Sequence, residues 1–239
     1  KLKEEAYNKT LIVIGDLKIL LFAGDTASRL NLLASAYKRL AMLAPDKNKR
    51  FLALKESMAY YLKAMKKSHE DDHIYPLINA IEISTILVLS KAIKPEGTFT
   101  VDTKKYKVFS FREAIDILTE KRENLEKNVD SDNLDYWDML AFLNLDFCLL
   151  LIDESKELEN RRWKKIISTF DEIWQKAGSE GKKLCELEHL KFLIYALQKA
   201  LDENTNIFLA YKDKGTSEDL ALHIKVLRRT LAKMKERQQ

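Results

Sequence analysis

The sequence is poor in the residues that interrupt helices. Only six glycines and three prolines occur among 239 residues, which excludes a collagen-like chain and disfavours a fold rich in tight β-turns. Charged residues make up 33% of the chain, and several of the strongest helix formers are charged. This balance predicts long helices, and the chain is long enough to bury a sizeable core.

Cysteine is scarce, and long apolar runs are missing. Cys148 and Cys185 both stand in apolar helical contexts, so we expect buried free thiols in a reducing compartment. The apolar stretch 11–23 is too short to span a bilayer, and Asp16 and Lys18 make it too charged. It also lacks the successive charged, apolar and small-residue regions of a signal peptide. The sequence therefore predicts a cytoplasmic protein.

The usual signatures of chemistry are also missing. The sequence contains no glycine-rich phosphate loop, no G-x-S-x-G elbow and no paired-cysteine metal spacing. The net charge of +4 is a small difference between 41 basic and 37 acidic residues, so it does not demand a polyanionic partner. We therefore expect a non-enzymatic protein without cofactor or metal.

Apolar residues recur with the period of a helix in four stripes, each of which predicts an amphipathic helix that buries one face. Glycine, proline and aspartate separate these helices, as expected of turns. The stripes are Phe51, Leu54, Met58, Tyr61 and Met65; Phe111, Ala114, Ile115, Leu118 and Leu125; Trp163, Ile166, Ile167, Phe170, Trp174 and Ala177; and Leu220, Ile224, Leu227, Leu231 and Met234.

The pattern predicts an all-α fold in a single domain over residues 1–239. Its parts are an N-terminal helix over 1–23 and four helical hairpins over about 26–67, 74–128, 133–177 and 183–237. Within the second hairpin, residues 98–109 interrupt the helical pattern. Apolar and polar residues alternate there on both sides of 102–105, which predicts one small β-hairpin insertion.

The first hairpin opens with the spacing of a tetratricopeptide repeat. In residues 26–39, apolar or small side chains follow one another at offsets of three, four and seven, which places them on one helix face, and a small residue among them lets the partner helix approach. The residues are Leu30, Leu33, Ala34 and Tyr37, with a second copy at Trp137, Leu140, Ala141 and Asn144. Such hairpins stack into a binding surface, so the sequence predicts a TPR-like α-solenoid.

Three segments in order resemble bacterial tetratricopeptide proteins with a TRAFs-binding-type helical domain: 26–39, 75–82 and 135–141. The resemblance covers about residues 25–180 and implies a regulatory binding module. Eukaryotic relatives form the central regulatory region of the apoptosis signal-regulating kinases. Bacterial members are joined to, or encoded beside, caspase-like CHAT proteases or other stress and defence effectors. A protein partner of this kind, in the same chain or operon, is therefore expected.

We thus expect a protein-interaction module that scaffolds or regulates an effector and binds a partner segment in a concave groove. Carried over from tetratricopeptide stacks, the first helix of each hairpin lines this groove. One end is basic and the other acidic, which suits an extended peptide. The predicted groove residues are Ser28, Asn31, Ser35, Lys38 and Arg39 of the first hairpin, Asn79 and Glu82 of the second, and Asp135, Asp138, Phe142, Leu145 and Asp146 of the third.

Basic clusters on two helices leave open an alternative, a nucleic-acid- or nucleotide-sensing domain. Such a surface also needs aromatic residues for stacking, and Trp163 belongs to an apolar stripe. Solvated helix faces therefore explain these clusters better. They are Arg161, Arg162, Lys164 and Lys165, and Lys225, Arg228, Arg229, Lys233, Lys235 and Arg237.

A third alternative is a zinc hydrolase, because residues 69–73 match the H-E-x-x-H pattern. That chemistry needs both histidines on one face of a continuous helix. Tyr75-Pro76 follows at once, and a residue before proline resists helical geometry. We therefore interpret His69–His73 as a turn between two helices.

Overall fold

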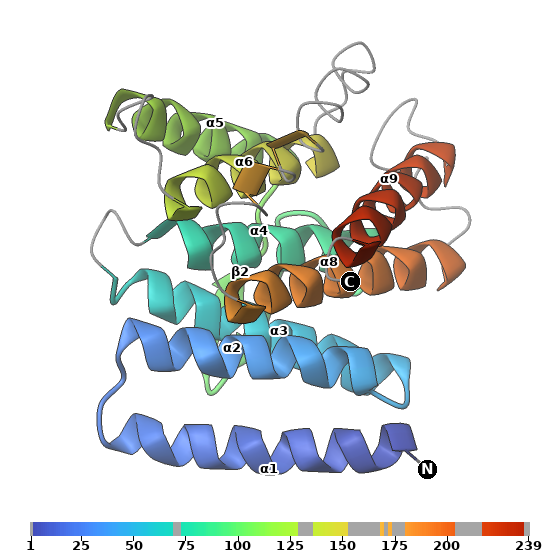
Figure 1. Ribbon diagram of the computed structural model, residues 1–239. Coiled ribbons are helices and arrows are strands. Elements are labelled where there is room, and N and C mark those ends of the chain that lie inside the picture. The colour runs from blue at the N-terminus through green and yellow to red at the C-terminus, as the bar shows by residue number, and fades with distance from the viewer. Residues whose placement is uncertain are drawn as a thin grey trace. The chain divides into compact units, whose positions relative to one another are not determined.

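The computed structural model describes residues 2–68, 73–128, 136–152, 168–169, 172–173, 180–203 and 217–236. These ranges form eight helices and one two-stranded antiparallel sheet (Figure 1), which confirms the all-α fold with a small β-hairpin. No helix within them is long and apolar enough to cross a membrane. The elements are α1 (Leu2–Phe22), α2 (Ala27–Leu43), α3 (Lys47–Met65), α4 (Ile74–Leu89), β1 (Thr98–Val101), β2 (Lys104–Lys107), α5 (Phe111–Asn128), α6 (Tyr136–Ile152), α8 (Glu180–Glu203) and α9 (Ser217–Glu236).

The chain divides into two compact units, Lys1–Ser110 and Phe111–Gln239. In the first, α2 packs against α1 and α3, and α3 packs against α4 and β1; in the second, α5 packs against α6 and α8 against α9. The boundary falls within the hairpin predicted over 74–128, between β2 and α5. The predicted single domain over 1–239 stays a prediction.

Helices α2 and α3 form the central hairpin of the first unit, and their ends follow from capping residues. The Thr26 side chain accepts a hydrogen bond from the backbone N–H of Arg29, and Asp46 accepts one from that of Lys49, which satisfies donors that each helix start leaves unpaired. Between the caps, Ala34 is fully buried, and its carbonyl accepts a 2.7 Å hydrogen bond from the hydroxyl of Ser57 on α3. The small side chain at Ala34 therefore permits the close approach that the repeat spacing predicts.

The β-hairpin is tied together by a two-residue turn. Phe99 pairs with Tyr106 across the two strands, and their rings stack at 5.6 Å. Asp102 and Thr103 have φ values of 47° and 67°, and a two-residue turn with positive φ at both positions matches the right-handed twist of the flanking strands. The turn is thus tighter than the four residues, 102–105, that the sequence analysis expected.

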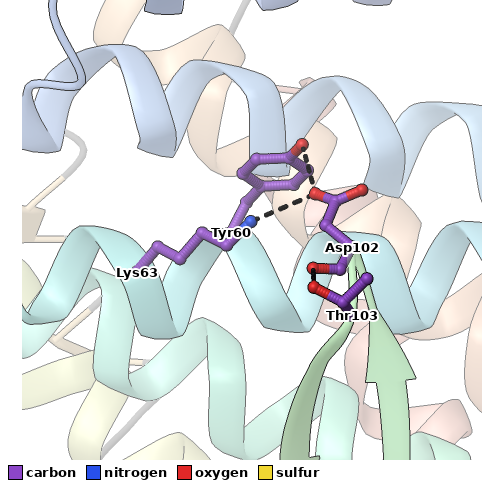
Figure 2. Close-up of polar contacts among 4 residues, drawn as sticks. All are labelled: Tyr60, Lys63, Asp102 and Thr103. Carbon is purple, nitrogen blue, oxygen red and sulfur yellow. Dashed lines mark hydrogen bonds and ion pairs between the residues drawn. The ribbon is translucent and has the colours of Figure 1, made fainter.

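The tip of this hairpin is fastened to α3 (Figure 2). The carboxylate of Asp102 accepts hydrogen bonds from Lys63 Nζ at 3.3 Å and from Tyr60 OH at 3.5 Å. Lys63 Nζ also lies 4.4 Å from the centroid of the Tyr60 ring, within cation–π distance. Burial raises the pKa of Tyr60 above its usual range, so its phenol stays protonated and donates. The hairpin therefore stabilises α3 rather than projecting freely.

Gly97, just before β1, leaves no room for a side chain. A Cβ there would lie 2.6 Å from the Lys94 carbonyl oxygen and 2.8 Å from Ile93 Cγ2. We expect Gly97→Ala to lower the free energy of unfolding by about 1–3 kcal/mol, because the backbone has to shift. Urea denaturation followed by circular dichroism measures this. The matched control is Gly15→Ala in α1, where nothing lies within 4 Å and alanine should stabilise by about 0.5–1 kcal/mol. Equal effects of the two substitutions would contradict the prediction.

The two cysteines occupy different environments. Cys148 is buried in α6, whereas Cys185 is exposed near the start of α8. The predicted burial is therefore wrong for Cys185. The reason is that Leu187 and Leu190 take the buried face of α8, while the neighbouring Leu184 is exposed.

Candidate partner-binding face

The predicted groove residues of α2 differ in exposure. Ser28 and Arg39 are exposed, Asn31 and Ser35 are half-buried, and Lys38 is buried. Leu32, which the sequence analysis did not select, is 59% exposed. Offsets of four, seven and eleven place residues on one side of a helix. The stripe on α2 therefore consists of Ser28, Leu32, Ser35 and Arg39.

Beside this stripe, Ser35 contacts two tyrosines from other helices. Its hydroxyl lies 2.9 Å from Tyr61 OH on α3 and 3.4 Å from Tyr75 OH on α4. Tyr61 is fully buried, and burial raises its pKa well above the usual value, so the phenol remains protonated. Tyr75 is 50% exposed, and its ring meets that of Tyr61 edge-on at 6.0 Å. Ser35 thus connects a buried tyrosine to an exposed one.

A second set of polar contacts lies beneath the stripe on α2. Lys38 Nζ donates a 2.6 Å hydrogen bond to Asn79 Oδ1, and Asn79 Nδ2 donates to the Tyr75 carbonyl at 2.9 Å. Lys38 Nζ also lies 5.9 Å from the centroid of the Tyr61 ring. The structure therefore brings together predicted groove residues of the first two hairpins, and it links them to the backbone that carries Tyr75.

Lys38, Asn79 and Glu82 are buried, with exposures of 7%, 2% and 1%, although the sequence analysis placed them on an open groove. The difference arises because helical register gives the direction of a side chain but not what covers it. Lys38 and Asn79 orient their neighbours through the hydrogen bonds described above. The exposed groove positions of the first unit are therefore Ser28 and Arg39, and partner binding by any of these residues stays a prediction.

The acidic end of the predicted groove lies in the second unit. Asp146 of α6 accepts a 2.6 Å hydrogen bond from Arg122 Nε of α5, and Arg122 also pairs with Glu126. Burial alone would lower the pKa of Arg122. The carboxylates of Asp146 and Glu126 have the larger combined effect, so the pKa of Arg122 is raised. Asp146 therefore connects α5 to α6. Asp138 and Phe142 are half-buried and Leu145 is buried, whereas Asp135 lies outside the described residues.

The basic residues of α9 border a hollow of about 470 Å³ against α8. Arg228 donates a 2.9 Å hydrogen bond to Gln198 of α8, while Leu201 and Ile224 supply apolar surface. No aromatic side chain is among the described lining residues, so nucleobases find no stacking platform there. Lys235 is exposed. Residues 161–165, the side chain of Lys233, and Arg237 lie outside what the structure describes.

Of the H-E-D-D-H segment, only His73 lies within the described residues. Its Nε2 is 2.8 Å from the Ser68 carbonyl oxygen, and α4 begins one residue later. Among the described residues, no three histidine, cysteine or acidic side chains gather as metal ligands do.

Three residues of this face were not predicted from the sequence: Leu32, Tyr61 as a partner of Ser35, and Tyr75. Leu32 carried a usable signal, since it is a leucine outside the apolar stripe of its own helix. Tyr61 belonged to a core stripe, and its hydroxyl partner on another helix cannot be inferred from periodicity. Tyr75 entered the sequence analysis only as the residue before Pro76 and as the first residue of segment 75–82, and not as a binding residue.

Comparison with known protein families finds a match to part of the chain. Residues 3–87 match the family described as Tetratricopeptide Repeats-Sensor, and this range runs from α1 into α4. No curated protein and no solved structure matches. The match supports a tetratricopeptide-type family. The finer resemblance to the TRAFs-binding-type domain stays a prediction.

Proposed function

We propose that the stripe on α2, together with Tyr75, binds a segment of a partner protein. Repeats of the tetratricopeptide type generally mediate protein–protein interaction and are generally not enzymes. The observation that carries the proposal is the pair of large exposed side chains at this face, Leu32 at 59% and Tyr75 at 50%. Leu32 belongs to α2, the helix whose sequence has the repeat spacing most clearly, and Tyr75 contacts the same helix at Ser35.

The composition of this face suits a protein ligand. Tyrosine and arginine are enriched among the residues that dominate binding energy at interfaces, and the face offers Tyr75 and the exposed Arg39. The contacts of Ser35 and Asn79 hold Tyr75 in place, so little conformational freedom is lost when a partner binds. The partner segment that suits this face has an apolar side chain that packs against Leu32 and Tyr75. It also has a carboxylate that pairs with the Arg39 guanidinium.

The partner in this proposal is an effector of stress or defence signalling, such as a caspase-like protease of the same chain or operon, and the setting is the cytoplasm. The resemblance of three segments to regulatory tetratricopeptide proteins supports this part. The module scaffolds or regulates the effector and carries out no reaction itself.

Site-specific photocrosslinking in cells tests the proposal. A benzoylphenylalanine at Leu32 should form a discrete covalent adduct with one protein, identified by mass spectrometry. The matched control is the same group at Leu52 of α3, which is also 59% exposed but lies outside the proposed face. We expect Arg39→Glu and Tyr75→Ala each to reduce the Leu32 adduct about tenfold or more, because each removes an interface contact of a type that often dominates binding.

Adduct yields that are the same at Leu32 and Leu52, or a Leu32 adduct that survives both substitutions, would contradict the proposal. Circular dichroism of the two variants checks that the helices are intact. Arg39 and Tyr75 are both exposed side chains, so we expect the helices to remain folded in both variants.

A further inference from the structure

Helix α1 exposes an unusual amount of apolar surface. Of the eleven large hydrophobic residues that are exposed in the described part of the chain, seven belong to this one helix. Scattered exposed hydrophobics are normal, but a concentration on one element marks an interaction site. The seven are Leu2 at 84%, Leu11 at 42%, Ile12 at 65%, Val13 at 50%, Ile19 at 65%, Leu20 at 48% and Phe22 at 92%.

Exposed residues recur along one side of α1 with the spacing of a coiled-coil contact. Six exposed residues occur in alternating steps of three and four, which is the repeat of helices that pack along their length. Ile14, the only buried residue of α1, falls on the opposite side, where α2 packs. Three of the six are apolar and three are charged, so apolar residues occur on both sides of α1, as in a helix that is covered on both. The residues of this outer stripe are Leu2, Glu5, Lys9, Ile12, Asp16 and Ile19.

We propose that the outer stripe of α1 binds the same stripe of a second copy of this chain, with the two helices antiparallel. The charges on the stripe carry this choice. Lys9 and Asp16 have opposite signs and lie on either side of Ile12. In a parallel pair each of them would face its own like charge. An antiparallel pair centred between Ile12 and Val13 places Lys9 of each copy level with Asp16 of the other.

The remaining features of the stripe agree with such a pair. The two-fold arrangement is self-complementary, because both copies use the same patch, and Ile12 lies at its centre, where apolar contacts are best shielded from water. Lys9 already pairs with Glu5 at 2.7 Å, so Asp16 of the second copy adds to an existing ion pair. Gly15, beside the stripe, has no neighbour within 4 Å of a Cβ position and leaves room for close approach.

The stripe is less suited to binding a membrane surface than to binding a second copy of the chain. Helices that lie on membranes carry an excess of lysine and arginine on their polar face. On α1 the basic residues Lys3, Lys9 and Lys18 are balanced by Glu4, Glu5 and Asp16, and two of these acidic residues, Glu5 and Asp16, stand within the outer stripe itself.

Analytical ultracentrifugation of the full chain tests the proposal. We expect a reversible monomer–dimer equilibrium, and Ile12→Lys should shift it to monomer at every concentration at which the wild type is a dimer. Leu52→Lys, at a leucine outside α1 that is 59% exposed against 65% for Ile12, should leave the equilibrium unchanged. Circular dichroism checks that each variant keeps its helices.

Charge reversal tests the antiparallel pairing itself. Lys9→Glu and Asp16→Lys should each weaken dimerisation about tenfold or more, because two-fold symmetry makes every substitution act twice and places like charges together. Combining them restores opposite charges, so the double variant should return to within about threefold of the wild type.

Three results would overturn the proposal. These are a wild-type chain that stays monomeric throughout, a double variant as weak as the single ones, and a dimer that Ile12→Lys leaves intact. Binding of a monomeric wild type to phosphatidylserine–phosphatidylcholine vesicles, lost in Ile12→Lys, would assign the stripe to a membrane instead. None of these measurements depends on the partner that binds the stripe on α2. Evidence against dimerisation through α1 would therefore leave the proposed function of α2 untouched, and the reverse also holds.

Discussion

Replacing Ala34 with tryptophan should unfold the hairpin of α2 and α3. Ala34 is fully buried, and its own carbonyl oxygen lies 2.7 Å from Ser57 Oγ on the facing helix. An indole cannot enter this contact without separating the two helices, because protein interiors are close-packed and inserted volume forces the backbone apart. We expect a loss of about 3 kcal/mol or more in the free energy of unfolding, at the upper end of the cost of overpacking.

Hydrogen exchange read by mass spectrometry locates this effect. Backbone amides of α2 and α3 should lose protection in Ala34→Trp, whereas those of α5 and α6 should keep it if the second unit folds by itself. Ser28→Trp is the matched control, because it adds the same side chain at an exposed position of the same helix. Unchanged protection in α2 and α3 of the Ala34 variant would show that these helices do not pack through a small residue.

Replacing Asn79 with leucine should cost nearly as much. Asn79 is 2% exposed, and it accepts the 2.6 Å hydrogen bond from the buried ammonium of Lys38. Leucine fills a similar volume but offers no acceptor, so a buried charge loses one of its hydrogen bonds. Removing one partner of such a buried contact costs about 2–3 kcal/mol. Urea denaturation of the variant beside the wild type measures the loss.

A double-mutant cycle separates the contact from simple repacking. Lys38→Met removes the ammonium, so Asn79→Leu should cost much less in that background than in the wild type, with a coupling energy of about 1–3 kcal/mol. Strictly additive costs would mean that the 2.6 Å contact contributes nothing to stability. Asn79→Leu should also weaken partner binding, because the Asn79 side chain donates a hydrogen bond to the backbone carbonyl of Tyr75 and Tyr75 is part of the proposed binding face.

Helix positions could be predicted well because they depend on local rules. The hairpin starts predicted near residues 26 and 74 lie within one residue of the first residues of α2 and α4, and those predicted near 133 and 183 lie three residues from the first residues of α6 and α8. Apolar periodicity, capping residues and turn residues all act within a few positions of the chain. The small β-hairpin could be predicted for the same reason, since alternation is also a local pattern.

The site could be predicted only in part, because its contacts join distant helices. Lys38 was predicted from the repeat register, whereas Asn79 was predicted without a firm register, and the two side chains meet across 41 residues of sequence. Register did not reveal that they are buried, since burial depends on what packs over a helix. Tyr61 and Tyr75 were missed because their contact with Ser35 depends on the distance between three helices.

The division of the chain after Ser110 also separates its chromophores. All three tryptophans, Trp137, Trp163 and Trp174, follow the boundary, whereas the first unit contains none. Six of the nine tyrosines precede it, namely Tyr7, Tyr37, Tyr60, Tyr61, Tyr75 and Tyr106. Tryptophan emission therefore reports on the second unit alone, while tyrosine absorbance is weighted towards the first. A single sample thus carries one optical signal from the second unit alone and another that is weighted towards the first.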